Sequence, residues 1–252
     1  SVNPGGPFLN PHLASVPIPP LSRDFPDHSG NPPVDFLKLA VDLSAFRSPL
    51  KLALQAAAAT GATGVLVDLR YGLPESEFSA SGRRHLQRYL EELGLRIAAA
   101  SFPTRRAFDD RTDLEARVAA TCRALTFARE LGSDVLILGV GSLAGGPEGE
   151  TRGLLVDVLN DLARHGNHIG AVPTIAASGS SAAAVLELVQ QLDEGPVGVD
   201  FDPAALTGQG ADAVDAFRLL LEYIRHVRVR DAIRESEGQY REVPVGRGEV
   251  AW

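Results

Sequence analysis

The sequence has no methionine, one cysteine and no long apolar run, and each of these features excludes or favours particular kinds of protein. The single Cys122 excludes a disulfide within the chain, and its place in a helical stretch favours an inert packed thiol. A membrane-spanning helix needs about 18 consecutive apolar residues, and no such run is present. The missing methionine indicates that residues before Ser1 have been removed or that the sequence is a fragment. We expect a cytoplasmic protein, and a cleaved signal peptide is the open alternative.

A surplus of basic residues is also missing. The chain has 24 Lys and Arg residues against 32 Asp and Glu residues, which gives a formal net charge of -8. Such a surface repels the phosphates of nucleic acids unless a local basic stripe overrides it. Arg105-Arg106 and residues 225–230 are only short basic clusters with acidic residues nearby. We therefore expect no nucleic-acid partner and no membrane partner.

Proline is unevenly distributed, with nine of the 17 prolines in the first 33 residues. These residues show no periodic apolar pattern, which predicts an irregular N-terminal arm over residues 1–34. A free tail and a strap docked on the domain are both open. Residues 35–252 then form one domain, since an α/β barrel often uses about 250 residues.

From Phe36 onward, short apolar runs alternate with helical patterns. Strands are predicted over residues 37–43, 64–69, 96–101, 135–140, 172–177, 197–201 and 226–229, and helices over 49–59, 81–93, 114–131, 153–169, 182–192 and 213–224. Most of these helices stop at a glycine suited to a left-handed C-cap. Six strand–helix repeats and a seventh strand favour a (β/α)8 TIM barrel, of class α/β, over an open sheet. The chain ends at Trp252 with no room for an eighth strand and helix, so we expect the C-terminal part of the barrel to be missing.

Three late segments carry a family resemblance: VGVDFDPAAL (197–206), HVRVRDA (226–232) and VPVGRGEVAW (243–252). Their order and spacing resemble the xylose-isomerase-like TIM barrel superfamily, which includes sugar-phosphate isomerases and epimerases and endonuclease IV. The resemblance runs from about Leu37 to Trp252. It implies a divalent Mn, Mg, Co or Zn ion at the carboxyl end of the barrel. The implied ligands are a Glu after strand five, an Asp after strand six, a His after strand seven and a Glu after strand eight.

This sequence departs from the implied ligand set. The strand-five Glu falls on Ala177, and the strand-seven His falls on Arg228, although the preceding His226 is kept. Asp202 is present at the strand-six position and is the single ligand-like residue, while Ala205 follows where relatives often have His or Asn. We therefore expect no metal cofactor, unless ligands not visible in the sequence rebuild the site.

Arg228 is the change that most opposes a metal. A guanidinium cannot ligate a metal and stays protonated. At about 4 Å and an effective dielectric of about 20, it would repel a divalent ion by roughly 8 kcal/mol. Asp200 and Asp202 have the same strand parity and should both face the barrel interior or mouth. We expect Arg228 to pair with one of them in the place of the metal.

The remaining charged residues near predicted strand ends are candidates for contacts to a ligand. With the residues above, the predicted substrate-binding set is Asp42, Asp68, Arg70, Arg105, Asp200, Arg228 and Arg247. Arginine forks suit phosphate and carboxylate groups. The alternatives are a salt-bridge layer for Asp42, Asp68 and Arg70, a solvated loop for Arg105, and a pair with Glu249 for Arg247. The sequence assigns no catalytic residue.

Three functions remain open from the sequence. The first, by resemblance, is a sugar isomerase/epimerase-family protein that binds a sugar-like or anionic small molecule at the barrel mouth, with metal-dependent catalysis weak or lost. The second is a noncatalytic barrel that serves as a binding module or as a subunit in a homo- or hetero-oligomer. The third is an endonuclease-IV-like nuclease, which the missing His and carboxylate ligands and the missing basic groove disfavour.

Overall fold

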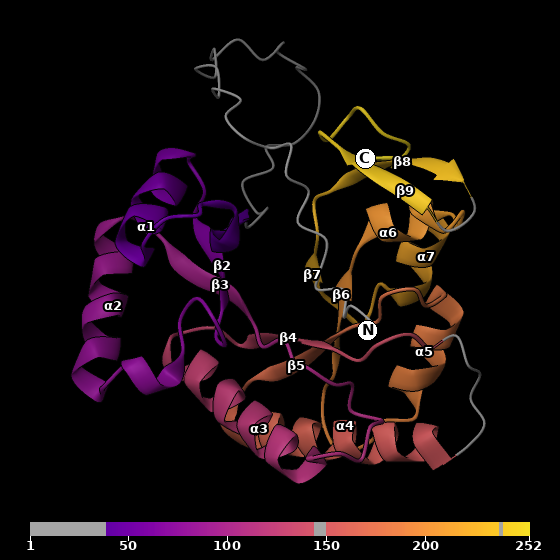
Figure 1. Cartoon of the computed structure of the whole chain (residues 1–252), viewed down its shortest axis with the longest axis horizontal. Helices are drawn as coiled ribbons and strands as arrows, with labels where there is room; N and C mark the ends of the chain where they lie inside the picture. The colour runs from indigo at the N-terminus through magenta and orange to yellow at the C-terminus, as the bar shows by residue number, and fades with distance from the viewer. Residues whose placement is uncertain (1–38, 144–149, 237–238) are drawn as a thin grey trace, which may run out of the picture. The chain divides into compact units, whose positions relative to one another are not determined.

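Seven parallel strands in sequential order form the centre of the fold (Figure 1). The computed structural model describes residues 39–143, 150–236 and 239–252. The strands are β1 (Ala40–Asp42), β2 (Gly64–Asp68), β3 (Arg96–Ser101), β4 (Val135–Gly139), β5 (Val172–Ala176), β6 (Gly198–Phe201) and β7 (Ile224–Val227). The predicted N-terminal arm, residues 1–34, lies outside the described residues.

Helices connect the strands and lie around the outer side of the sheet (Figure 1). They are α1 (Leu50–Ala59), α2 (Ala80–Glu92), α3 (Leu114–Glu130), α4 (Glu150–Ile169), α5 (Ala182–Gln190), α6 (Pro203–Gly208) and α7 (Ala213–Leu220). A parallel strand followed by a returning helix is the repeating unit of a TIM barrel. The structure therefore confirms an α/β barrel fold, with β1 and β7 as the two edges of the sheet in the described part of the chain.

Apolar side chains are buried on both faces of the strands. The larger cluster lies between the sheet and the helices, and a smaller one inside the barrel contains Leu66, Ala99, Val135 and Ile137. Burial on both faces explains the continuous apolar runs that predicted a covered parallel sheet. The glycines that follow α2 and α3, Gly94 and Gly132, have φ values of 68° and 92°. They form the predicted left-handed C-caps.

Two parts of the prediction were wrong after β6. The short helix α6 begins at Pro203, directly after its N-cap Asp202, and no helix was predicted there between the strand 197–201 and the helix 213–224. The predicted helix 213–224 ends at Leu220, and β7 already begins at Ile224. A continuous apolar run does not by itself distinguish helix from strand, so the boundary inside residues 219–224 was not visible in the pattern.

After β7 the chain forms a hairpin that was not predicted from the sequence. The hairpin is antiparallel and consists of β8 (Asp231–Ser236) and β9 (Gln239–Val243). This hairpin packs on α6, where the Tyr240 ring lies directly over Gly208. A Cβ atom at Gly208 would overlap that ring, so glycine is what lets the hairpin approach α6.

Gly208→Ala is expected to destabilise the fold by about 1–3 kcal/mol, because the added methyl group overpacks the contact with Tyr240. Gly153→Ala in α4 is a matched control, since a Cβ there meets nothing within 4 Å. The control should stabilise by about 0.5 kcal/mol through helix propensity. Urea unfolding measures both free energies, and equal values for the two variants would contradict the packing described.

In the ranges that the structure covers, no helix combines the length and apolar character required to cross a lipid bilayer.

Candidate binding site at the barrel mouth

A pocket of about 190 Å³ opens at the carboxyl ends of β5, β6 and β7. Its charged lining comes from two carboxylates and two guanidinium groups: Asp200, Asp202, Arg228 and Arg230. The carboxyl ends of the strands are where TIM-barrel enzymes carry their active sites. This pocket is therefore the candidate functional site.

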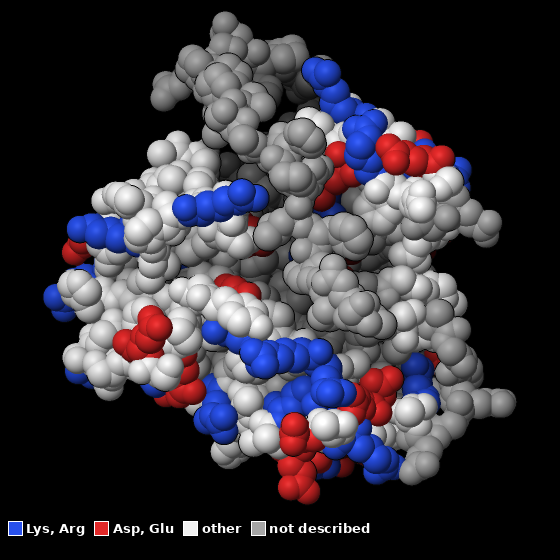
Figure 2. Space-filling view, in the orientation of Figure 1, with Lys and Arg blue, Asp and Glu red and all other residues white. Residues whose placement is uncertain are grey.

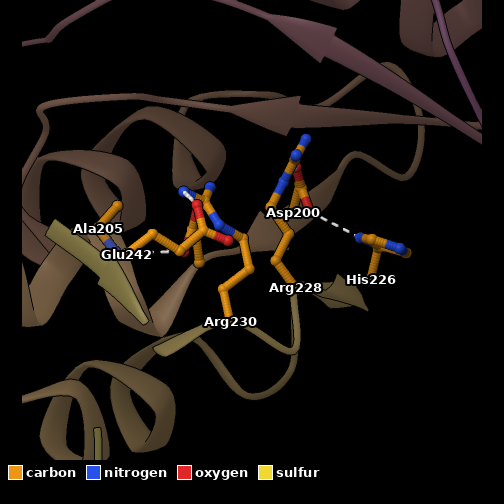
Figure 3. Close-up of polar contacts among 7 residues, drawn as sticks. Asp200, Ala205, His226, Arg228, Arg230 and Glu242 are labelled. Atoms are coloured by element: carbon orange, nitrogen blue, oxygen red, sulfur yellow. Dashed lines mark hydrogen bonds and ion pairs between the residues drawn. The ribbon is translucent and has the colours of Figure 1, made fainter. Parts of the chain in front are cut away.

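Asp200 is the most buried of the charged groups, with 1% of its side chain exposed. Its Oδ1 lies 2.7 Å from His226 Nδ1, and its Oδ2 accepts a hydrogen bond of 2.7 Å from Arg228 Nε (Figure 3). Asp200 and His226 are directly paired across β6 and β7, which explains why the two side chains meet. The expected ion pair of Arg228 is present, and Asp200 is the carboxylate that makes it.

Arg228 uses only part of its hydrogen-bonding capacity in this pair. Its Nε is bound to Asp200, whereas its two terminal nitrogens have no hydrogen-bond partner among residues 39–143, 150–236 and 239–252. The side chain is 31% exposed and lines the pocket. The site therefore holds a guanidinium that is anchored at one edge and open at the other.

Asp202 has two structural contacts of its own. One oxygen caps α6 by accepting a 3.2 Å hydrogen bond from Ala205 N, and the other lies 2.8 Å from Arg230 Nη1. Arg230 reaches Glu242 on β9 through Nη2, also at 2.8 Å, and so ties the hairpin to the pocket (Figure 3). Burial alone would lower the pKa of Arg230, but Glu242 and Asp202 outweigh it and raise that pKa above its ordinary value.

These residues do not fit the divalent metal that the resemblance implies. Both oxygens of Asp200 and both oxygens of Asp202 already have partners, and Ala177 and Ala205 offer only methyl groups. Across the described parts of the chain, no group of three or more His, Cys, Asp or Glu side chains is placed to hold a metal ion. Arg228 also brings a positive charge to the position where the resemblance implies a histidine ligand.

The other predicted binding residues do not line this pocket. Asp42 accepts a hydrogen bond from Ser44 N, and Asp68 accepts from Arg70 N and Tyr71 N, so both carboxylates shape the turns after their strands.

Arg70 is held by local contacts rather than by the pocket. Its Nη1 donates to the carbonyl of Pro103, and its guanidinium lies 5.7 Å from the Tyr71 ring centre and 5.6 Å from that of Phe102. Arg105 and Arg247 are exposed. Of the predicted binding set, the structure therefore places Asp200 and Arg228 at the pocket, together with Asp202, the residue predicted as ligand-like.

Three contributors to the site were not predicted: the contact of His226 with Asp200, the pocket-lining Arg230, and Glu242. Arg230 lies one residue beyond the predicted strand 226–229 and has the same parity as Arg228, which is the signal that points to it. Glu242 comes from the hairpin, whose charged sequence gave no strand pattern.

A second buried carboxylate organises the segment after the hairpin. Asp231 is fully buried, and its two oxygens accept four backbone hydrogen bonds of 2.8–3.1 Å from Ala232, Gly246, Gly248 and Val250. Burial alone would raise the pKa of Asp231, but these four donors outweigh it and hold the pKa below its ordinary value. The charge of Asp231 therefore fixes the course of residues 246–250.

On the face of the molecule shown in Figure 2, Lys and Arg side chains gather in several places, each with Asp or Glu side chains close by.

The barrel with its pocket at the carboxyl ends of the strands defines the class of protein. A family model described as "Xylose isomerase-like TIM barrel" matches residues 54–252. The chain belongs to this family. Among curated proteins, none matches the sequence.

Solved structures show the same fold. A xylose isomerase domain protein from Planctomyces limnophilus is 20% identical, with a TM-score of 0.72 over 85% of this chain and 81% of that one. The probable 3-DHS dehydratase AsbF from Bacillus anthracis is 16% identical, with a TM-score of 0.69 over 85% of each chain. A D-psicose 3-epimerase is 15% identical, with a TM-score of 0.65 over 80% of this chain and 77% of that one. A dehydratase and an epimerase share this fold, so the fold alone does not select a reaction.

Proposed function

We propose that this chain binds a small anionic or sugar-like molecule at the barrel mouth, and that the metal-dependent catalysis of its isomerase and epimerase relatives is weak or lost. The observation that carries this proposal is Arg228, which is anchored to buried Asp200 and leaves two terminal nitrogens open beside the pocket. Planar N–H pairs of this kind bind carboxylate and phosphate groups in a bidentate manner.

The anchoring of Arg228 supports binding because it removes an entropic penalty. A free arginine side chain must be ordered when a ligand binds, whereas the bond from Nε to Asp200 already orders this one. His226 approaches the same carboxylate, so Arg228 is not the only group that offsets its charge. Asp200 and Asp202 balance Arg228 and Arg230 in number, so we expect directed hydrogen bonds, rather than net charge, to hold the ligand.

Isothermal titration in EDTA with inorganic phosphate, gluconate and benzoate tests this proposal. At least one of these anions should bind, and Arg228→Gln should weaken that binding at least tenfold, because hydrogen bonds to charged groups contribute about 1.5–3 kcal/mol. Arg218→Gln is the matched control, since Arg218 is exposed on α7 and pairs with the exposed Asp215. Absence of binding by all three anions, or equal affinities for the two variants, contradicts the proposal.

Metal analysis separates this proposal from a rebuilt metal site. After mild chelation and reloading with Mn, Co, Mg and Zn, the purified protein should retain less than one ion per chain. One tightly bound ion per chain would show that other ligands complete a site, and isomerase assays would then be the next measurement.

A further inference from the structure

The pocket has an apolar part that the proposed function does not use. Beside the charged groups and the polar residues Ser178, Ser180 and Gln209, the residues that line it include six apolar ones: Ala182, Val185, Val199, Phe201, Leu206 and Leu220. Five of them belong to the buried core between the sheet and helices α5, α6 and α7. Val185, Leu206 and Leu220 come from α5, α6 and α7, so the pocket extends past the charged groups toward the helical layer.

Such a lining discriminates between ligands of equal charge. A hydroxyl group buried against Val185, Leu206 or Leu220 finds no hydrogen-bond partner in those side chains, and this loss weakens binding by about tenfold or more for each group. A hydrocarbon group gains affinity from the same burial. The pocket of about 190 Å³ is also comparable in size with an apolar cavity of about 150 Å³ that holds one benzene molecule.

We infer that the ligand of this pocket is a small carboxylic acid with an apolar body, such as a single ring or a branched alkyl group, rather than a polyhydroxylated sugar acid. Its carboxylate binds the open nitrogens of Arg228, and its apolar body lies among Val185, Leu206 and Leu220. The inference rests on the proposed function, because it uses Arg228 as the anion-binding group.

Titration with benzoate, cyclohexanecarboxylate and gluconate tests this inference. All three are monocarboxylates, but the first two carry an apolar ring and gluconate carries a hydroxylated chain. Benzoate or cyclohexanecarboxylate should bind at least tenfold more tightly than gluconate. Gluconate binding that is equal or tighter, and that depends on Arg228, would overturn the inference and leave the proposed function standing. Failure of all three acids and of phosphate to bind would overturn both.

A pair of neighbouring substitutions on α5 tests the position of the apolar body. Ala182 lines the pocket, whereas Ala183 is exposed and does not. Ala182→Leu should fill the apolar part and weaken benzoate at least tenfold, with phosphate affinity unchanged, and Ala183→Leu should change neither. Thermal unfolding shows whether both variants fold. Equal benzoate affinities in two folded variants would overturn the inference.

Discussion

Asp231→Asn is expected to lower the Tm by on the order of 5–10 °C, the largest loss of stability among the substitutions considered. The carboxylate is fully buried and accepts four backbone N–H groups. An asparagine keeps one accepting oxygen and turns the other into an NH₂ group, which faces two N–H donors. Those two donors lose their acceptor, and buried donors without partners are strongly destabilising.

The effect of Asp231 should depend on pH in a defined direction. Its pKa in the folded state is below the unfolded value of about 3.9, so the carboxylate contributes its full stabilisation above that value. The contribution is lost as the pH falls through the folded-state pKa. The difference in Tm between the wild type and Asp231→Asn should therefore be constant near neutral pH and should shrink in acid below about pH 4.

Thermal unfolding followed by circular dichroism measures this difference. Asp215→Asn is the matched control, because Asp215 is exposed and pairs with the exposed Arg218. The control should unfold within about 2 °C of the wild type. A Tm for Asp231→Asn equal to that of the control, or a gap that widens in acid, would be incompatible with the hydrogen bonds described.

The double substitution Ala177→Glu and Arg228→His is expected to create divalent-metal binding that the wild type lacks. It restores the two ligand types that the family resemblance implies beside Asp202. Removing the guanidinium also removes a repulsion of roughly 8 kcal/mol on a divalent ion at about 4 Å. Carboxylate oxygens and imidazole are suitable ligands for Mn, Co and Zn.

Equilibrium dialysis with Mn and Co measures the gain, which should be at least a hundredfold in affinity over the wild type. Adding Asp202→Asn to the double variant should reverse most of it, and this triple variant is the control for unspecific binding. A double variant that binds no better than the wild type would show that Arg228 is not what keeps a metal from this mouth.

The barrel could be predicted from the sequence because its strands are apolar on both faces. Continuous apolar runs such as residues 64–68 and 135–139 are typical of strands in a parallel sheet that is covered on both faces. Glycines mark the ends of the helices between them. The region after β6 could not be predicted in the same way. Helix α6 has only six residues, and the hairpin from β8 to β9 depends on a tertiary contact, the approach of Tyr240 to Gly208.

Only part of the candidate site could be predicted, from strand parity and from the family resemblance. Parity gave Asp200 and Asp202 the same face and the family resemblance added Arg228, but neither decided which carboxylate Arg228 contacts. The register of β6 and β7 decides this, because it places Asp200 opposite His226. The hydrogen bonds of Arg230 to Asp202 and to Glu242 depend on the hairpin, and no local pattern in the sequence predicts them.

The hydrogen bond that Asp202 accepts from Ala205 N gives this residue a structural role that does not depend on a metal. A residue whose sole role was to ligate a metal would be free to change if the metal were no longer used. Asp202 also begins a helix, and an N-cap contributes about 1 kcal/mol to folding whether or not a metal is bound. Selection for a folded barrel is therefore sufficient to retain it. An aspartate at this position in a relative is weak support for activity, whereas the residues at positions 177 and 228 are informative.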